Sequence, residues 1–449
     1  MSDGSLNSFL FSTREMTSVF SPSAQLRAMT RFEWALGSAL ERQGLAERGT
    51  GEALEKVLGE EFVDAASLVD EASNDGNIAI PFVRQLTAAV EEQDEAAARW
   101  VHFGATSQDL LDTALVLQMR DGLQLIEAAL GRLDAALHAK IDAHRDILML
   151  GRTWLQPGPP VTLGLKLAGT LAALRRARVR VNAEAGRALV LQFGGAVGTL
   201  ASLGESGGGV SARLAQMLNL PEPELPWHAQ RDCFTSLVQG LATLTGTLAK
   251  LGTDMALLMQ AETGEVTEGG DKRGGSSTMP HKRNPVACAA LRAIHTRMPG
   301  LAATMLLAMP QEQERGLGMW QAEWEIIPEA FRLTSASIAY GIDLTENLEV
   351  RSDRMQANLH ATLGLPLAES ISAALVPKIG RTKSHELLRK ASAKARQQSR
   401  QLSEVLNEMP EVTAHLTASD IERLFDPRNY LGSTRRFIAR VLGDDDAHD

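Results

Sequence analysis

A long stretch between residues 109 and 146 constrains the fold of this chain more than any other feature. It contains no proline and no glycine except Gly122 and Gly131, so little in it forces the backbone out of a helix. Its apolar side chains recur at spacings of three and four residues, the period of an α-helix. They are Leu115, Met119, Leu123, Ile126, Leu130, Leu133, Leu137 and Ile141. At about 1.5 Å per residue this helix would be roughly 55 Å long, which predicts a fold built on long helices.

Four more long helical patterns follow, at about residues 160–192, 229–262, 285–308 and 321–347. Their apolar residues cover most of the helix circumference, which is typical of helices buried on several sides. One subunit is unable to bury five such helices completely, so we expect a homo-oligomer formed through a helix bundle. A long monomeric bundle is the alternative. No internal repeat of about 20 to 50 residues points to a repeat array.

The remaining sequence predicts shorter helices on both sides of the long ones. A chain of 449 residues exceeds the size at which one core usually stops growing, so several domains are expected. There is little sign of β structure. We therefore predict an all-α chain with an N-terminal helical domain at 1–108, a central long-helix domain at 109–364 and a C-terminal helical domain at 365–449.

Composition excludes several classes of partner. The formal net charge is −10 and no basic tract is long enough to override it, which argues against nucleic acid. The N-terminal residues 1–21 lack the pattern of a secretory signal, and no apolar run approaches the ~18 residues of a membrane span. Cys233 and Cys288 are the only cysteines and do not lie at metal-binding spacing. We expect a cytoplasmic protein without a disulfide framework, a thiolate metal site or a membrane partner.

Residues 274–285, Gly-Gly-Ser-Ser-Thr-Met-Pro-His-Lys-Arg-Asn-Pro, are the most informative segment for chemistry. Asn284 suits a helix N-cap and Pro285 the first helical position of the pattern that follows. The segment thus predicts a mobile loop that carries hydroxyl, ammonium and amide groups to a helix N-terminus, where anions bind. A simple capped turn would explain Asn284 and Pro285, but it requires neither the serines nor Lys282.

This loop resembles the signature loop of the fumarase/aspartase superfamily. Residues 102–109, His-Phe-Gly-Ala-Thr-Ser-Gln-Asp, resemble the first active-site segment of that superfamily, and residues 151–164, beginning Gly-Arg-Thr-Trp-Leu-Gln, resemble the second. The three segments occur in family order, and the similarity spans roughly residues 10 to 440. The resemblance implies a three-domain, all-helical fold and a homotetramer whose active sites each collect segments from three subunits.

The resemblance also implies roles for residues of the loop. The superfamily reaction passes through a carbanion next to a carboxylate, an aci-carboxylate with two negative oxygens, which fixed donors stabilise. Lys282 and Asn284 match the donors to this carboxylate. Ser276 matches the general base, or the general acid in the addition direction, although a one-residue shift would select Ser277 instead. Met279 lies among the residues expected to contact substrate.

The other two segments supply further candidates for substrate binding. Thr106 and Ser107 precede the first long helix, where they can cap it and bind a carboxylate at the same time. His102 is either a core histidine or a substrate contact. In the second segment, Gln156 matches a position that contacts the substrate carboxylate, whereas Arg152 either contacts substrate or holds its loop.

Trp154 departs from the pattern of the superfamily. In fumarases and adenylosuccinate lyase a histidine at this position assists the leaving group, and an indole cannot exchange a proton near pH 7. Expulsion of an amine or hydroxide requires such an acid, whereas a carboxylate leaving group, with an acid pKa of about 4, does not. In the reverse direction an ionised carboxylate is already a competent nucleophile. Trp154 therefore favours intramolecular lactonization and is placed among the residues that contact substrate.

A second departure lies at residues 314–324. Adenylosuccinate lyase carries phosphate-binding groups where this chain has Trp320 and Trp324, so a phosphate pocket is not expected here, and packing in the bundle is the other interpretation of the two indoles. Arg315 remains and can bind a substrate carboxylate through two hydrogen bonds.

Residues 151–164, 189–204 and 309–324 resemble the lactonizing branch of the superfamily in particular. This implies a cycloisomerase that converts 3-carboxy-cis,cis-muconate, a small anionic tricarboxylate, to 4-carboxymuconolactone in protocatechuate degradation, with neither a metal nor an organic cofactor. A fumarate-releasing lyase of the adenylosuccinate type and a catalytically inactive structural relative are the alternatives.

Overall fold

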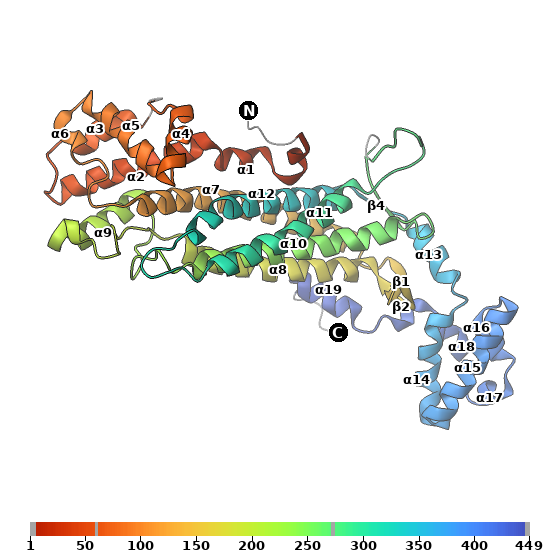
Figure 1. Ribbon diagram of the computed structural model, residues 1–449. Helices are drawn as coiled ribbons and strands as arrows, with labels where there is room; N and C mark the ends of the chain where they lie inside the picture. The colour runs from red at the N-terminus through yellow and green to blue at the C-terminus, as the bar shows by residue number, and fades with distance from the viewer. Residues whose placement is uncertain (1–5, 59–61, 271–273, 445–449) are drawn as a thin grey trace. The chain divides into compact units, whose positions relative to one another are not determined.

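The computed structural model describes residues 6–58, 62–270 and 274–444, and these form an almost entirely helical protein (Figure 1). The N-terminal helices are η1 (Leu6–Phe11), α1 (Arg14–Val19), α2 (Pro22–Arg42), α3 (Thr50–Val57), α4 (Ala65–Asp75), α5 (Ala79–Glu91) and α6 (Glu95–Ala98). The central elements are α7 (Ser107–Ala143), β1 (Leu148–Thr153), β2 (Gln156–Thr162), α8 (Leu163–Ala188), η2 (Ala201–Ser206), α9 (Gly207–Leu218), α10 (Asp232–Met259), β3 (Val266–Glu268), α11 (Val286–Ala308), α12 (Met319–Glu346) and β4 (Leu348–Val350). The C-terminal elements are α13 (Ser352–His360), η3 (Leu365–Leu367), α14 (Ala368–Ile379), α15 (Arg381–Gln398), α16 (Leu402–Asn407), α17 (Pro410–Thr413), α18 (Ala418–Leu424), η4 (Pro427–Tyr430) and α19 (Thr434–Leu442).

The five long helices predicted from the apolar spacing are confirmed as α7, α8, α10, α11 and α12. The predicted pattern at 109–146 corresponds to α7, which has 37 residues. Seven of the eight apolar side chains that define the pattern are less than 10 % exposed, namely Met119, Leu123, Ile126, Leu130, Leu133, Leu137 and Ile141, whereas Leu115 is half-buried. Burial of this apolar surface is the main term that stabilises the helices.

Local chemistry sets where the helices begin. Ser21 caps α2, because its side chain accepts the N–H of Ala24, and Pro22 occupies the first turn. At the start of α7 the N–H of Thr106 donates to the carboxylate of Asp109 at 3.0 Å, which is one half of a capping box. Asp109 therefore supplies this cap, whereas the Thr106 hydroxyl, which the sequence offered as a cap, accepts a hydrogen bond from Arg315.

The chain divides into two compact units. The first contains residues 1–130, 177–246 and 293–339, and the second contains 131–176, 247–292 and 340–449, so each long helix contributes residues to both. In the first unit α2 packs against α3 and α9. In the second unit α14 to α18 surround a small apolar core that includes Ile371, Leu388, Leu402, Val412 and Ile421 (Figure 1). The three domains proposed from the sequence, with boundaries at 108 and 364, stay a prediction.

Two small antiparallel sheets were not anticipated from the sequence. β1 pairs with β2 from Leu148↔Thr162 to Thr153↔Gln156, with an irregularity between Leu150 and Gly151. β3 pairs with β4. A two-residue turn joins β1 to β2, and both of its residues, Trp154 and Leu155, have positive φ (54° and 62°). Such turns normally contain Asn and Gly, so neither the turn nor the proline-rich second strand gave a recognisable signal.

Within the described residues no single helix combines the length and apolarity needed to cross a membrane. One pair bent by 74°, Ser352–His360 with Leu365–Ile379, meets those requirements only when its two parts are counted together. This part of the chain also contains no group of three or more His, Cys, Asp or Glu side chains that could hold a metal ion.

Candidate functional site

The first set of candidate residues lies at the N-terminus of α7 in the first unit. Thr106 and Ser107 are half-buried there. The guanidinium of Arg315, more than 200 residues later in the sequence, donates to the Thr106 hydroxyl. The structure therefore brings together the hydroxyl residues of the first segment and the one arginine predicted to bind a carboxylate.

Arg315 has no counter-ion among the residues that the structure describes. No carboxylate of the described residues lies within ion-pair distance of its guanidinium, and its hydrogen bond to Thr106 is the only one it makes within that part of the chain. Burial lowers the pKa of Arg315, and the more distant Asp109 and Asp112 only partly oppose this. A half-buried cation that has no carboxylate partner among the described residues, and that is bonded to a hydroxyl at a helix N-terminus, is suited to bind an anion.

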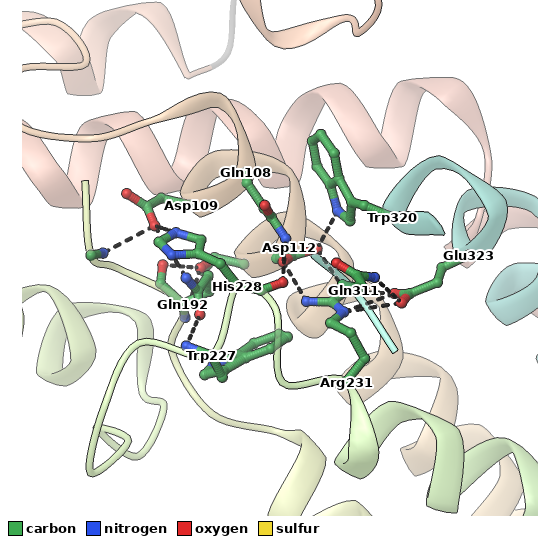
Figure 2. A network of polar contacts seen from close by, with 12 residues as sticks. Gln108, Asp109, Asp112, Gln192, Trp227, His228, Arg231, Gln311, Trp320 and Glu323 are labelled. Carbon is green, nitrogen blue, oxygen red and sulfur yellow. Dashed lines mark hydrogen bonds and ion pairs between the residues drawn. The ribbon is translucent and has the colours of Figure 1, made fainter. Parts of the chain in front are cut away.

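The carboxylate of Asp109 connects the start of α7 to the loop that contains Gly194 and Gly195 (Figure 2). Its fully buried carboxylate accepts the N–H groups of Thr106, Gly194 (3.0 Å) and Gly195 (2.9 Å). The Nε2 atom of His228 lies 2.7 Å from the same carboxylate. Gly195 has a positive φ (68°), and the two bonds to Asp109 hold this turn against the start of α7.

A second buried cluster, centred on Arg231, lies beside Asp109 (Figure 2). Arg231 is fully buried and pairs with Asp112 (2.7 Å) and Glu323 (2.6 Å). Burial alone would lower the pKa of Arg231, but the two carboxylates outweigh it and raise the pKa above its ordinary value. Burial also raises the pKa of Glu323, against the influence of Arg231. This arginine, unlike Arg315, has all of its charge compensated inside the protein, so its role is structural.

Of the two tryptophans that stand where adenylosuccinate lyase binds phosphate, Trp320 is buried and Trp324 is half-buried against it. Trp320 is 5 % exposed and donates its indole N–H to Asp112 at 3.0 Å. The Trp324 ring meets it edge-on, with ring centroids 5.0 Å apart. The packing interpretation of these residues holds, and Trp320 belongs to the Arg231 cluster.

His102 is held by a buried carboxylate that the sequence did not reveal as a partner. Its Nδ1 atom lies 2.6 Å from Glu33 Oε1, and its backbone N–H donates to Glu33 Oε2 at 2.9 Å. Burial alone would lower the pKa of His102, but Glu33 and then Asp109 outweigh it, so the pKa is raised. His102 is therefore paired like a core histidine, while its other ring nitrogen has no partner among the described residues.

The second set of candidates lies in the loop 274–285 of the second unit. Gly274 and Asn284 close this loop, because the Gly274 carbonyl accepts the backbone N–H (2.7 Å) and the side-chain amide (3.1 Å) of Asn284. Gly274 has a φ of 65°, and a Cβ there would lie 2.1 Å from the Asn284 carbonyl oxygen. Only glycine fits at this position.

Inside the loop, Ser276 and Ser277 have different surroundings. The Ser276 hydroxyl is half-buried and accepts the N–H groups of Thr278 (3.3 Å) and Met279 (3.1 Å), whereas Ser277 is exposed. Lys282 is exposed, and its ammonium has no partner among the described residues. Met279 is 41 % exposed.

The helix N-terminus that follows the loop is not a free anion site, and this corrects the sequence-based interpretation. The N–H groups of Ala287 (3.1 Å) and Cys288 (2.9 Å) donate to the buried carboxylate of Glu268, which lies at the end of β3. Glu268 thus caps α11 in place of Asn284. The prediction was wrong because the capping carboxylate comes from before the loop, where sequence spacing gives no indication of it.

The third set of candidates lies on the β1–β2 hairpin, also in the second unit. The guanidinium of Arg152 makes two bonds to Glu265, which is fully buried, at 2.7 and 3.1 Å. Trp154, at the tip, is 97 % exposed, and Gln156 is exposed as well. Of the two interpretations of Arg152, the geometry favours a role in holding its loop.

The structure thus assembles His102, Thr106, Ser107 and Arg315 in the first unit. In the second unit it places Ser276, Met279, Lys282 and Asn284 on one loop, and Arg152, Trp154 and Gln156 on one hairpin. Sequence reasoning missed the buried carboxylates that hold these groups. The one available signal was an isolated acidic residue in an apolar stretch, such as Glu33 between Phe32 and Trp34.

Comparison with known proteins gives a consistent result. A profile of a lyase family matches residues 27–300, and a profile of the adenylosuccinate lyase C-terminus matches residues 364–441. The chain is 47 % identical to 3-carboxy-cis,cis-muconate cycloisomerase of Pseudomonas aeruginosa, over 97 % of this chain and 95 % of that protein. It is 39 % identical to nitrosuccinate lyase of Streptomyces davaonensis, over 95 % and 92 % of the two chains.

A solved structure agrees with these relatives. The crystal structure of 3-carboxy-cis,cis-muconate lactonizing enzyme from Pseudomonas putida superposes with a TM-score of 0.93 at 44 % identity, covering 98 % of each chain. The superfamily suggested by the three segments is therefore confirmed along nearly the whole length. The chain belongs to the family of the 3-carboxy-cis,cis-muconate cycloisomerases, within the fumarase/aspartase superfamily.

Proposed function

We propose that this protein is a cycloisomerase that converts 3-carboxy-cis,cis-muconate to 4-carboxymuconolactone. The observation that carries this proposal is the combination of an intact Ser276–Lys282–Asn284 loop with an indole at residue 154. The loop supplies what the superfamily needs to make and protonate an aci-carboxylate, and Trp154 has no proton to exchange near neutral pH. The names and identities of the relatives support the same substrate.

In the proposed reaction a carboxylate oxygen of the substrate adds to a carbon of the conjugated diene. A C–O bond forms, and the π electrons move to the carbon next to a second carboxylate, which becomes the aci-carboxylate. Ser276 then protonates that carbon and recovers its proton from solvent. All carbon and oxygen atoms are retained, and one proton is taken up for each substrate trianion that becomes a lactone dianion.

The surroundings of Ser276 favour it over Ser277 as the proton donor. Two N–H groups point at the Ser276 oxygen, and such donors stabilise the negative charge that develops when the hydroxyl gives up its proton. Lys282 lies on the same loop and supplies a positive charge. Asn284 uses one of its two amide hydrogens to close the loop, so one remains to donate to substrate.

The hydroxyls of Thr106 and Ser107, together with Arg315, provide a second place for a substrate carboxylate. Arg315 supports this role because its charge is not compensated by any described carboxylate. Gln156, Trp154 and Met279 are exposed and available for contact. We assign Arg152 to positioning the hairpin, because its guanidinium is bound to Glu265.

We further propose that the working enzyme is a cytoplasmic homotetramer whose sites combine segments of different copies. Large apolar side chains on the hairpin tip and on the long helices support this proposal, since a lone subunit leaves them in water. Trp154 is 97 %, Leu155 69 %, Val179 71 % and Leu307 77 % exposed. Light scattering coupled to size-exclusion chromatography tests it, and a monomer that retains full activity would refute it.

Two assays in parallel test the activity. Loss of 3-carboxymuconate absorbance, accompanied by uptake of about one proton per turnover in weak buffer, is the expected result. Cleavage of adenylosuccinate alone would instead identify a fumarate-releasing lyase. Inactivity in both assays would indicate a relative that has kept the fold without the chemistry.

A further inference from the structure

One ring nitrogen of His102, Nδ1, is bound to a buried carboxylate, whereas Nε2 has no partner among the described residues. The carboxylate of Glu33, on α2, binds this residue twice, through Nδ1 at 2.6 Å and through the backbone N–H at 2.9 Å. The two bonds hold a residue whose φ is 58°, a conformation that few residues other than glycine adopt. Glu33 is 1 % exposed, so this anchor is rigid and shielded from water.

The carboxylate bound to Nδ1 determines whether Nε2 accepts or donates a hydrogen bond. Because Glu33 accepts only from a protonated Nδ1, a neutral His102 ring would present Nε2 as an acceptor, and a protonated ring would present it as a donor. The charged groups that act on the ring are Glu33 from α2 and Asp109 from α7, and both are negative. They raise the pKa of His102 against the effect of burial, which favours the protonated ring.

We propose that Glu33 is a positioning residue that keeps His102 protonated and oriented, so that Nε2–H donates to a carboxylate of the substrate. His102 lies four residues before Thr106, whose hydroxyl already receives Arg315. The first unit then offers two separate cationic donors, which suits a substrate with several carboxylates. This proposal rests on the proposed function for the identity of the substrate, but the state of His102 can be measured without any substrate.

Histidine NMR on the free protein tests the first half. The His102 signal is assigned by its loss in His102→Gln, and its titration is followed in wild type and in Glu33→Gln. The variant keeps the size of the side chain and an acceptor oxygen. We expect the titration midpoint of His102 to fall by about one to three pH units in Glu33→Gln. An unchanged midpoint would overturn the proposal whatever the substrate proves to be.

Steady-state kinetics test the second half. Above the midpoint measured for Glu33→Gln, KM for 3-carboxymuconate should rise roughly 10- to 100-fold, the usual value of one hydrogen bond to a charged group, with little change in kcat. Below that midpoint KM should return toward the wild-type value, because bulk protons restore the imidazolium. A purely structural role for Glu33 would show no such recovery and would refute the donor assignment, as would a loss confined to kcat.

Glu41→Gln is the matched control. Glu41 lies on the same helix and also accepts a backbone N–H, that of Gly51 at 2.9 Å, but it contacts no histidine of the described residues. This variant should keep both the His102 titration and the wild-type KM at every pH. A change in KM as large as that of Glu33→Gln would mean that general damage to α2, not the state of His102, explains the effect.

Discussion

Replacement of Arg315 by methionine is the most decisive test of the substrate-binding assignment. Methionine keeps much of the side-chain volume and removes the charge and the donors. If Arg315 pairs with a substrate carboxylate, its loss leaves that carboxylate without its partner. Removing one partner of a buried charge pair costs about 2 to 5 kcal/mol, and because Arg315 is only half-buried the lower part of the range applies. At 1.36 kcal/mol per factor of ten, about 2 to 3 kcal/mol corresponds to roughly a 30- to 150-fold loss in kcat/KM.

The same substitution should have little effect on folding. Within the described residues Arg315 makes one hydrogen bond, to the Thr106 hydroxyl, which is worth about 1 kcal/mol and can be partly replaced by water. The free energy of unfolding, measured in urea, should therefore change by no more than about this amount. Arg315→Lys is the graded control, because it keeps the charge and loses the paired donors, so its kcat/KM should lie between those of wild type and Arg315→Met.

The assay follows the disappearance of 3-carboxymuconate at several concentrations, so that kcat and KM are resolved. A folded Arg315→Met with kcat/KM within about threefold of wild type would refute the assignment of Arg315 to substrate. A variant that loses activity only because it unfolds more easily would refute the structural part of the reasoning.

Four further expectations concern other parts of the site and the fold. Ser276→Ala should reduce kcat by about 10²- to 10⁴-fold while Ser277→Ala changes it far less, and the reverse order in the lactonization assay would exchange their roles. Trp154→His should not accelerate lactonization, because a carboxylate nucleophile needs no proton transfer at that side; a faster variant would contradict this. Arg231→Met should lower the free energy of unfolding by about 3 to 5 kcal/mol in urea titrations, since it leaves two buried carboxylates unpaired, and a loss below 1 kcal/mol would be inconsistent with the buried cluster. Because the pKa of His102 is raised in the fold, its stabilising contribution is complete below the unfolded value of about 6.5 and is lost as pH rises through the folded value. His102→Gln should therefore destabilise the protein more at pH 6 than at pH 9, and equal losses at both would argue against the pairing.

The sequence by itself determined the class of the fold and the chemistry of the loop. Apolar spacing alone predicted five long helices, because the 3.6-residue period is a local property that any stretch of chain displays. The segment 274–285 likewise shows by its residue types alone that hydroxyl, ammonium and amide groups lie close together on one loop. Trp154 indicated that the site lacks a proton donor at this position, because an indole does not exchange a proton near pH 7 wherever it lies.

Only the tertiary structure decided which groups are free and which are already bound. Arg152, Arg231 and Arg315 are the same residue type in the sequence, yet Arg152 and Arg231 pair with buried carboxylates, whereas Arg315 pairs with none of the described carboxylates. In the same way Glu268, not Asn284, caps α11, and Glu33 holds His102. Each of these pairs joins residues far apart in the chain. Tertiary packing decides which carboxylate meets which group, and a local sequence pattern contains no information about that packing.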